Sequence, residues 1–300
     1  MRVGTLQMFR QGVSSILEQQ TQLLRTQQQL SSGRRIVNPS DDPIGSAQLI
    51  GLSESLQITE QYQRNIQRVQ TRLELEDTAL GSVGDALQRA RELAVQGLND
   101  TNAGDERVAM AKEIRQILDE VLGLANRKSE NGEYLFAGFQ GQTTPFSHDG
   151  AGNFSYAGDQ GQRNIQVGPA RQVADGDPGQ AVFLDIPATS GGTEDLFTTL
   201  YNLASDLEAD APKPNSLDQL DNAMTHLLGF RATVGARLNA VDSQENINGA
   251  LLVQLEQTRS SIRDLDYAEA ASQLSQQSVT LQAAQQAFVR VQNLNLFNYL

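Results

Sequence analysis

Two long runs of mostly apolar residues, spaced alternately three and four positions apart, limit the folds open to this chain more than any other feature of its sequence. We call the residues of each run its seam. Such spacing places side chains on one face of a helix, in the a/d pattern of coiled coils. The first run spans residues 6–30 and has two polar interruptions, at Gln20 and Gln27. The second run comprises Ile66, Val69, Leu73, Glu76, Leu80, Val83, Leu87, Ala90 and Ala94. Each run predicts a long helix that packs along a single seam.

The segment between the two runs must interrupt any helix. Residues 31–43 contain one Gly and two Pro among Ser, Asn and Asp, all of which favour turns. Asp41 or Asp42, just before Pro43, is typical of a helix N-cap with a proline in the first turn. The second helix should therefore begin at about Pro43.

Turn formers and apolar spacing also delimit the later helices. Residues 99–104 should end the second helix, and a return helix is expected from Val108 to about Asn126. The remaining helices are predicted from their apolar residues: a short helix over Leu196, Leu200, Leu203 and Leu207; a long one from a cap at Asn215 or Ser216 through Leu217, Leu220, Met224, Leu227, Arg231, Val234, Leu238 and Val241, and on to Ile262; and a final one over Leu274, Leu281, Ala284, Phe288 and Val291.

The region between these helices differs in composition. An Asn131-Gly132 pair, which favours a hairpin turn, precedes it. Residues 138–192 then hold 11 of the 25 glycines. Alternation of apolar and polar residues predicts three short strands here: 153–156, 164–167 and 182–186.

We therefore expect a mainly α protein with a small β insertion. Because a helix rises about 1.5 Å per residue, the long helices predict an elongated rod of antiparallel helices, with the terminal helices paired as a coiled coil. The expected domains are a terminal coiled-coil assembly segment, residues 1–42 and 267–300; a helical rod domain, residues 43–137 and 193–266; and a small β-rich variable domain, residues 138–192.

Composition excludes several kinds of chemistry. The 300 residues include no Cys, which excludes a disulfide framework, a thiolate nucleophile and a zinc ribbon. The two histidines, His148 and His226, cannot form a three-ligand metal site without carboxylates. The local signatures of metalloproteases, serine hydrolases, P-loop proteins and dinucleotide-binding proteins are absent. We expect no enzymatic activity, no cofactor and no metal.

The charge of the chain is unevenly distributed. The net charge is −13, and residues 137–222 alone contain 12 acidic and 3 basic residues. This balance argues against sequence-independent binding of nucleic acid or anionic lipid. No stretch approaches the length of an apolar membrane span, and the first residues lack the apolar core of a cleaved leader. The protein is expected in the cytoplasm or exported without a cleaved leader.

The C-terminal helix has an apolar stripe but almost no charge, since Arg290 is the one charged residue after residue 270. The chain supplies too little apolar sequence to cover this stripe, so we expect partner subunits to cover it. The expected subunit-assembly residues, buried only on assembly, are Leu6, Phe9, Val13, Ile16, Leu23, Leu30, Leu274, Leu281, Ala284, Phe288 and Val291.

Three blocks of sequence resemble the flagellin-like axial proteins of the bacterial flagellum. The first is residues 31–43, whose Asn-Pro-Ser-Asp-Asp-Pro core is similar to hook–filament junction members of the family rather than to flagellin. The second is residues 131–146, and the third lies in the tail, at 266–271, 281–284 and 296–300. The motif loop of the family corresponds here to Arg34, Asn38, Pro39, Asp41, Asp42 and Pro43.

The resemblance implies a flagellin-like fold and a structural adaptor that joins the hook, through hook-associated protein 1, to the flagellin filament, in a ring with copies of itself. It also implies export by the flagellar type III system, a chaperone that holds the C-terminal helix, and a final location on the extracellular flagellum. A flagellin filament subunit is the alternative within the same family.

Two further hypotheses come from other classes of protein. An extracellular enzyme housed in the insertion is disfavoured by the small size of that region and by the absence of an HExxH motif. Carboxylate pairs at 41/42, 194/195 and 175/177 are better explained by helix N-termini and turns than by catalysis. A coiled-coil signalling rod predicts one unbroken hairpin of heptads without a Gly-rich β region.

Overall fold

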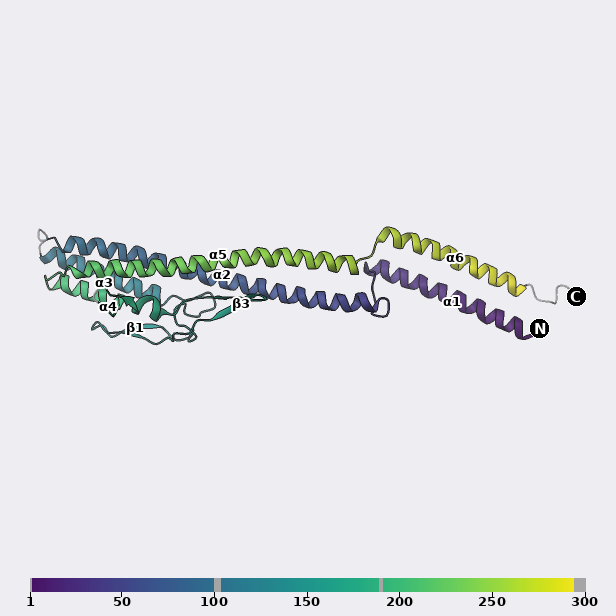
Figure 1. Ribbon diagram of the computed structural model, residues 1–300, viewed down its shortest axis with the longest axis horizontal. Coiled ribbons are helices and arrows are strands. Elements are labelled where there is room, and N and C mark those ends of the chain that lie inside the picture. The colour runs from purple at the N-terminus through teal and green to yellow at the C-terminus, as the bar shows by residue number, and fades with distance from the viewer. Residues whose placement is uncertain (1, 100–103, 189–190, 294–300) are drawn as a thin grey trace. The chain divides into compact units, whose positions relative to one another are not determined.

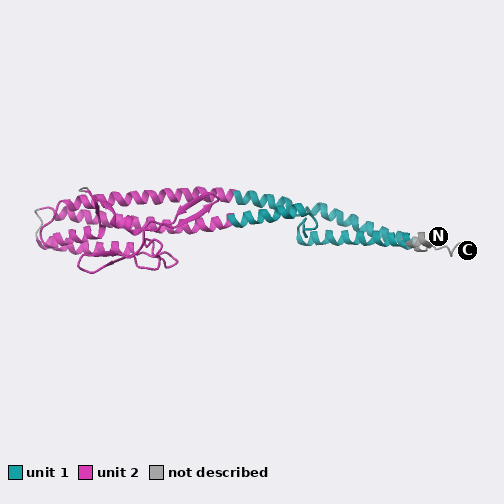
Figure 2. Cartoon of the chain, turned by 60° about the horizontal axis from the view of Figure 1, so that its bottom comes forward, with its two compact units in different colours: residues 1–58, 251–300 teal, residues 59–250 magenta. Residues whose placement is uncertain are grey.

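The computed structural model describes residues 2–99, 104–188 and 191–293. The chain divides into two compact units (Figure 2): residues 1–58 with 251–300 form unit 1, and residues 59–250 form unit 2. Two long helices, α2 (Pro43–Gly97) and α5 (Asn215–Arg263), contribute residues to both units. The expected class, mainly α with long helices and small antiparallel strand pairs, is confirmed. Within the described residues, no helix is long and apolar enough to cross a membrane.

The core of unit 2 is built on the second heptad run. From Ile66 to Ala94, every seam position of α2 is at most 1% exposed. The helices α3 (Gly104–Ala125) and α4 (Leu196–Glu208) pack against each other and bury their apolar stripes in the same cluster. The break after α2 and the return helix are confirmed, although the return helix begins at Gly104 and not at Val108.

Within unit 2, α2 and α5 lie side by side and run in opposite directions (Figure 1). The polar contacts between the two helices show the antiparallel direction, because the contacting residues have rising numbers along α2 and falling numbers along α5. The contacts are Gln63 Nε2 to the Glu245 carbonyl at 3.2 Å, Asp77 with Arg231 at 3.0 Å, and Arg91 with Asp221 at 2.5 Å. The predicted seam of α5 is confirmed in its fully buried members, which are Leu220, Leu227, Val234 and Val241.

The insertion between α3 and α4 contains three separate two-stranded antiparallel sheets among its described residues. They pair β1 (Phe146–His148) with β2 (Phe154–Tyr156), β3 (Asn164–Gly168) with β4 (Arg171–Ala174), and β5 (Ile186–Pro187) with β6 (Thr193–Glu194). The predicted strands at 153–156 and 164–167 are therefore confirmed.

The predicted strand at 182–186 is wrong over most of its length. Residues Gln180–Leu184 form one π-helical turn, η1, and only Ile186 of the predicted segment is in a strand. The adjacent side chains of Val182 and Phe183 are both buried, whereas adjacent side chains of a strand point to opposite faces. Phe183 packs edge to face on Phe136, with ring centroids 5.1 Å apart. Tertiary packing here outweighs the strand propensity of the segment.

Unit 1 contains α1 (Arg2–Ser32), α6 (Tyr267–Asn293) and the adjoining ends of α2 and α5. The terminal helices α1 and α6 lie side by side in opposite directions, as the sequence predicts (Figures 1 and 2). Residues 33–42 connect α1 to α2, and residues 264–266 connect α5 to α6. The predicted terminal domain ends at these connections; the division into three domains remains a prediction.

Candidate assembly surface

The helices α1 and α6 contact each other through apolar side chains. The rings of Phe9 and Phe288 lie 5.3 Å apart, tilted by 44°. Gly12 permits this approach, because a Cβ at that position would lie 2.8 Å from the Phe288 ring. An aromatic pair of this kind adds about 0.5–1.5 kcal/mol beyond the burial of its area. The two phenylalanines therefore anchor the end of the α1–α6 pair nearest the chain termini.

Most of the predicted assembly residues are half-buried in this helix pair. They are Val13, Ile16, Leu23 and Leu30 on α1, and Leu274, Leu281, Ala284 and Phe288 on α6. Phe9 is more open, at 48% exposed. The side chains of Leu6 and Val291 lie outside the described residues. None of the described members is as deeply buried as the seam of unit 2, and their complete burial on assembly remains a prediction.

A second set of apolar side chains on the same two helices lies in solvent. Leu17 and Leu24 of α1 are 57% and 51% exposed, and Val279 and Val289 of α6 are 62% and 53% exposed. We call these four the outer apolar residues. The a/d spacing does not predict them, because they fall outside it; each of the two leucines follows a seam position by one residue.

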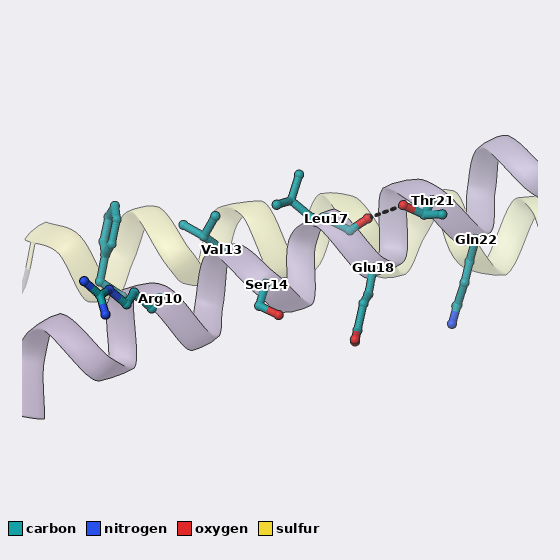
Figure 3. A pocket seen from close by; sticks show the side chains of 8 residues that line it. Arg10, Val13, Ser14, Leu17, Glu18, Thr21 and Gln22 are labelled. Atoms are coloured by element: carbon teal, nitrogen blue, oxygen red, sulfur yellow. Dashed lines mark hydrogen bonds between the residues drawn. The ribbon is translucent and has the colours of Figure 1, made fainter.

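A shallow groove of about 660 Å³ runs along α1 and is lined by residues between 9 and 22. Figure 3 shows Val13 and Leu17 projecting to one side of α1, and Ser14 and Glu18 projecting to the other. The groove therefore has one apolar and one polar edge. Such a surface suits the apolar face of a partner helix better than a small polar substrate. Among the described residues, no group of three or more His, Cys, Asp or Glu side chains could hold a metal.

The motif loop ties the start of α2 to the end of α5. Gly33 follows α1 with a positive φ of +67°. The N–H of Arg35 donates to the Arg263 carbonyl at 2.7 Å, and its guanidinium donates twice to the Ile262 carbonyl, at 2.9 and 3.1 Å. In return, the N–H of Leu265 donates to the Gly33 carbonyl at 3.1 Å. The loop thus satisfies carbonyl groups that the end of a helix leaves without helical partners.

Of the two predicted N-cap candidates, Asp42 is the one that caps α2. Its Oδ1 accepts from the N–H of Gly45 at 2.8 Å, and its Oδ2 pairs with Arg35 at 3.3 Å. The helix begins at Pro43, as predicted. The backbone N–H of Gly45, and more weakly Arg35, lowers the pKa of the Asp42 carboxyl because both favour its charged form.

Asp41 holds the shape of the loop itself. Its Oδ2 accepts from the N–H groups of Asn38 at 2.9 Å and Val37 at 3.2 Å, and its Oδ1 pairs with Arg25 at 3.2 Å. These partners, Asn38 foremost, lower the pKa of the Asp41 carboxyl. The two adjacent carboxylates therefore work as a cap and a turn, not as an acid–base pair.

The remaining motif residues are exposed: Arg34, Asn38 and Pro39. Arg34 takes part in the loop through its backbone, which forms an isolated β-bridge with Asp264. The side chain that bonds the motif loop to the end of α5 is that of Arg35, which is not among the predicted motif residues. The sequence offers no signal that separates two adjacent arginines, since the choice depends on carbonyls more than 200 residues away.

Models of known families match both ends of the chain. The bacterial flagellin N-terminal helical region matches residues 3–141, and the bacterial flagellin C-terminal helical region matches residues 217–300. These matches include α1, α2 and α3 on one side and α5 and α6 on the other. The class defined by the fold and its terminal helix pair is therefore that of flagellin-like axial proteins.

Relatives that match along the whole length narrow the class. Flagellar hook-associated protein 3 of Escherichia coli is 30% identical, with 99% of each chain covered, and that of Salmonella typhimurium is 28% identical over the same share. A flagellin of Bacillus subtilis is 27% identical over 87% of this chain and 86% of its own. The chain belongs to the flagellar hook-associated protein 3 family.

Solved structures share the fold. The flagellar hook-associated protein-3 of Legionella pneumophila has a TM-score of 0.66 at 21% identity, covering 70% of this chain and 98% of its own. FlgL of Xanthomonas campestris has a TM-score of 0.63 at 24% identity, covering 70% of this chain and 99% of its own.

Proposed function

We propose that this chain is a structural adaptor of the hook–filament junction on the extracellular bacterial flagellum. It joins the hook, through hook-associated protein 1, to the flagellin filament, and copies of the chain form a ring at the junction. The flagellar type III system exports it unfolded, with a chaperone on the C-terminal helix. Its full-length relatives support this role by name, and a solved structure from Legionella pneumophila with a TM-score of 0.62 is titled a flagellar junction protein.

The observation that carries the proposal is the incomplete burial of α1 and α6. These helices contact each other, yet the four outer apolar residues, all aliphatic, remain more than half exposed along them. Burying an aliphatic side chain fully contributes about 1.5–3 kcal/mol. The outer apolar residues therefore offer enough free energy to attach a helix of a neighbouring subunit.

Composition agrees with export followed by assembly. A chain without Cys cannot be trapped by a disulfide after leaving the cell. The nearly uncharged α6 can be covered by a neighbour without the desolvation of many charges.

The test is complementation of a strain that lacks the gene, whose cells should keep their hooks and release flagellin into the medium. A Leu17→Asp/Leu24→Asp variant should be secreted but should not restore filaments, because a buried carboxylate without a partner costs several kcal/mol. Ser15→Asp is the matched control, since Ser15 is exposed and lies about 160° around α1 from Leu17. It should restore filaments seen by electron microscopy. Full filaments with the double variant would refute the role of this surface.

A second experiment separates the adaptor from the flagellin alternative. Purified protein is added to filament seeds and to hooks that carry hook-associated protein 1. An adaptor should bind the hooks and not elongate into long filaments. Elongation on filament seeds would favour a filament subunit.

A further inference from the structure

Charged side chains cluster in the interior of unit 2, where α2 and α5 meet the insertion. Glu76, Asp177 and Asp175 are 1%, 4% and 6% exposed. Four other charged groups face them: Arg72 from α2, Arg237 from α5, Arg163 from the insertion and Glu133 from the turn after α3. The proposed assembly surface in unit 1 uses none of these groups.

Two of the acids have close partners. Both carboxylate oxygens of Asp177 accept from Arg237, each at 2.9 Å, and one also accepts from Gln162 at 2.8 Å. Asp175 pairs with Arg163 at 2.6 Å and lies 3.8 Å from Arg72. Both aspartates are therefore ion-paired with arginines.

Glu133 completes the set of paired acids. Its Oε2 lies 3.4 Å from Arg72 and 3.5 Å from Arg163. The three arginines are thus balanced by three carboxylates, those of Asp175, Asp177 and Glu133, before Glu76 is counted.

Glu76 is placed differently. Its Oε1 accepts from the backbone N–H of Asp177 at 3.0 Å, while its buried Oε2 has no hydrogen-bond partner among the described residues. A protonated Glu76 leaves the cluster neutral, and an ionised Glu76 adds one uncompensated buried charge. Burial and the charge of Asp177 raise the pKa of Glu76 to about 8, against the weaker opposing effects of the Asp177 N–H, Arg237 and Arg72.

The N–H group that donates to Glu76 belongs to a short segment that is held by three backbone hydrogen bonds. Residues 175–179, which we call the latch segment, follow β4 and precede η1. The N–H of Asp175 donates to the Arg163 carbonyl at 3.1 Å, that of Asp177 to Glu76, and that of Gly179 to the Phe136 carbonyl at 2.9 Å. Among these three N–H groups, only that of Asp177 donates to a group that can ionise.

We propose that Glu76 is a proton-controlled latch: with its proton it fastens the latch segment to α2, and without its proton it releases the segment. Opening the segment exposes Glu76 to water, where its carboxyl ionises near its ordinary value. Opening therefore releases one proton over the range between that value and the folded one. One released proton makes an equilibrium about tenfold more favourable for each pH unit.

The test is amide hydrogen exchange on the full chain between pH 5 and pH 9, expressed as protection factors so that intrinsic exchange is removed. Protection of the latch-segment amides should fall about tenfold per pH unit from pH 5 to about pH 8 and then level off. Glu76→Gln, which keeps the acceptor but cannot ionise, should give protection that does not change with pH. A flat profile in the wild-type chain, or an unchanged slope in Glu76→Gln, would overturn the latch.

Two comparisons sharpen this result. Glu74→Gln removes an exposed carboxyl two residues away on α2 and should keep the wild-type profile; loss of the slope in this variant would show that Glu76 is not the group responsible. At pH 8 the amides of α4 should stay better protected than those of the latch segment. Equal protection would mean that unit 2 opens as a whole, which would contradict a local latch.

Discussion

Replacing Arg237 by Met should destabilise unit 2 by several kcal/mol. The carboxylate of Asp177 is buried and accepts three hydrogen bonds, two from Arg237 and one from Gln162. Methionine fills much of the same volume without a charge, so Arg237→Met would leave a buried carboxylate with one neutral side-chain donor. Removing one partner of a buried ion pair costs about 3–5 kcal/mol.

The assay is thermal unfolding by calorimetry, supported by circular dichroism of the purified chain. For a domain of this size, each kcal/mol lowers Tm by about 2–4 °C. The Tm of unit 2 should therefore fall by roughly 6–20 °C in the variant.

The chain offers a matched control on the same helix. Arg231 of α5 pairs with Asp77 at 3.0 Å, but the two side chains are 41% and 37% exposed. Solvent screens such a pair, and Arg231→Met should cost less than about 1 kcal/mol. Adding Asp177→Asn to Arg237→Met removes the orphaned charge and should recover most of the loss. Equal effects of the two single variants, or no recovery in the double variant, would refute the argument.

Three further predictions concern packing, backbone and pH. Leu80→Ala, at a fully buried seam position, should lower the unfolding free energy in urea by about 2–5 kcal/mol. Gly33→Ala should cost about 1 kcal/mol or more and speed amide exchange at Leu265, because φ is +67° and the new Cβ would lie 2.6 Å from the hydroxyl of Tyr267; wild-type exchange would contradict this. The unfolding free energy of unit 2 should fall by roughly 1.4 kcal/mol per pH unit from about pH 5 to about pH 8. In this range folded Glu76 keeps its proton, because its pKa is raised to about 8, whereas Glu76 of the unfolded chain has already lost its proton. Urea titrations at several pH values check this, with Glu76→Gln losing that contribution.

The helices could be predicted from the sequence because their signals are local. The seam from Ile66 to Ala94, a helix start at Pro43 capped by Asp41 or Asp42, and the break after α2 all follow from spacing and turn chemistry within a few residues. The π-helical turn at Gln180–Leu184 could not be predicted, since its conformation depends on contacts with Phe136 and Phe146, which lie far from it in sequence.

Polar residues whose surroundings are made by distant parts of the chain could not be predicted either. Glu76 occupies a seam position of the second heptad run, and the spacing of that run gives no sign of its charged surroundings. Its environment is made by Asp177 and Arg237, which approach it from the insertion and from α5. Arg35 is similar, because its role depends on the carbonyl of Ile262 at the end of α5. Long-range partners of this kind leave no periodic signal in the sequence.

The helix α1 carries more apolar surface than one partner helix can cover. Its a/d positions, such as Ile16 and Leu23, form the narrow stripe of a two-stranded coiled coil. Leu17 and Leu24 follow them by one residue, at flanking positions where a two-stranded coiled coil usually places charged side chains. Apolar residues there widen the stripe to the 100° or so that is typical of helices with more than one neighbour. Since α6 covers the a/d stripe and leaves both leucines exposed, we expect a neighbouring subunit to supply the missing helix. Substitution of these leucines should therefore separate assembly from folding, which substitution within the α1–α6 seam cannot do.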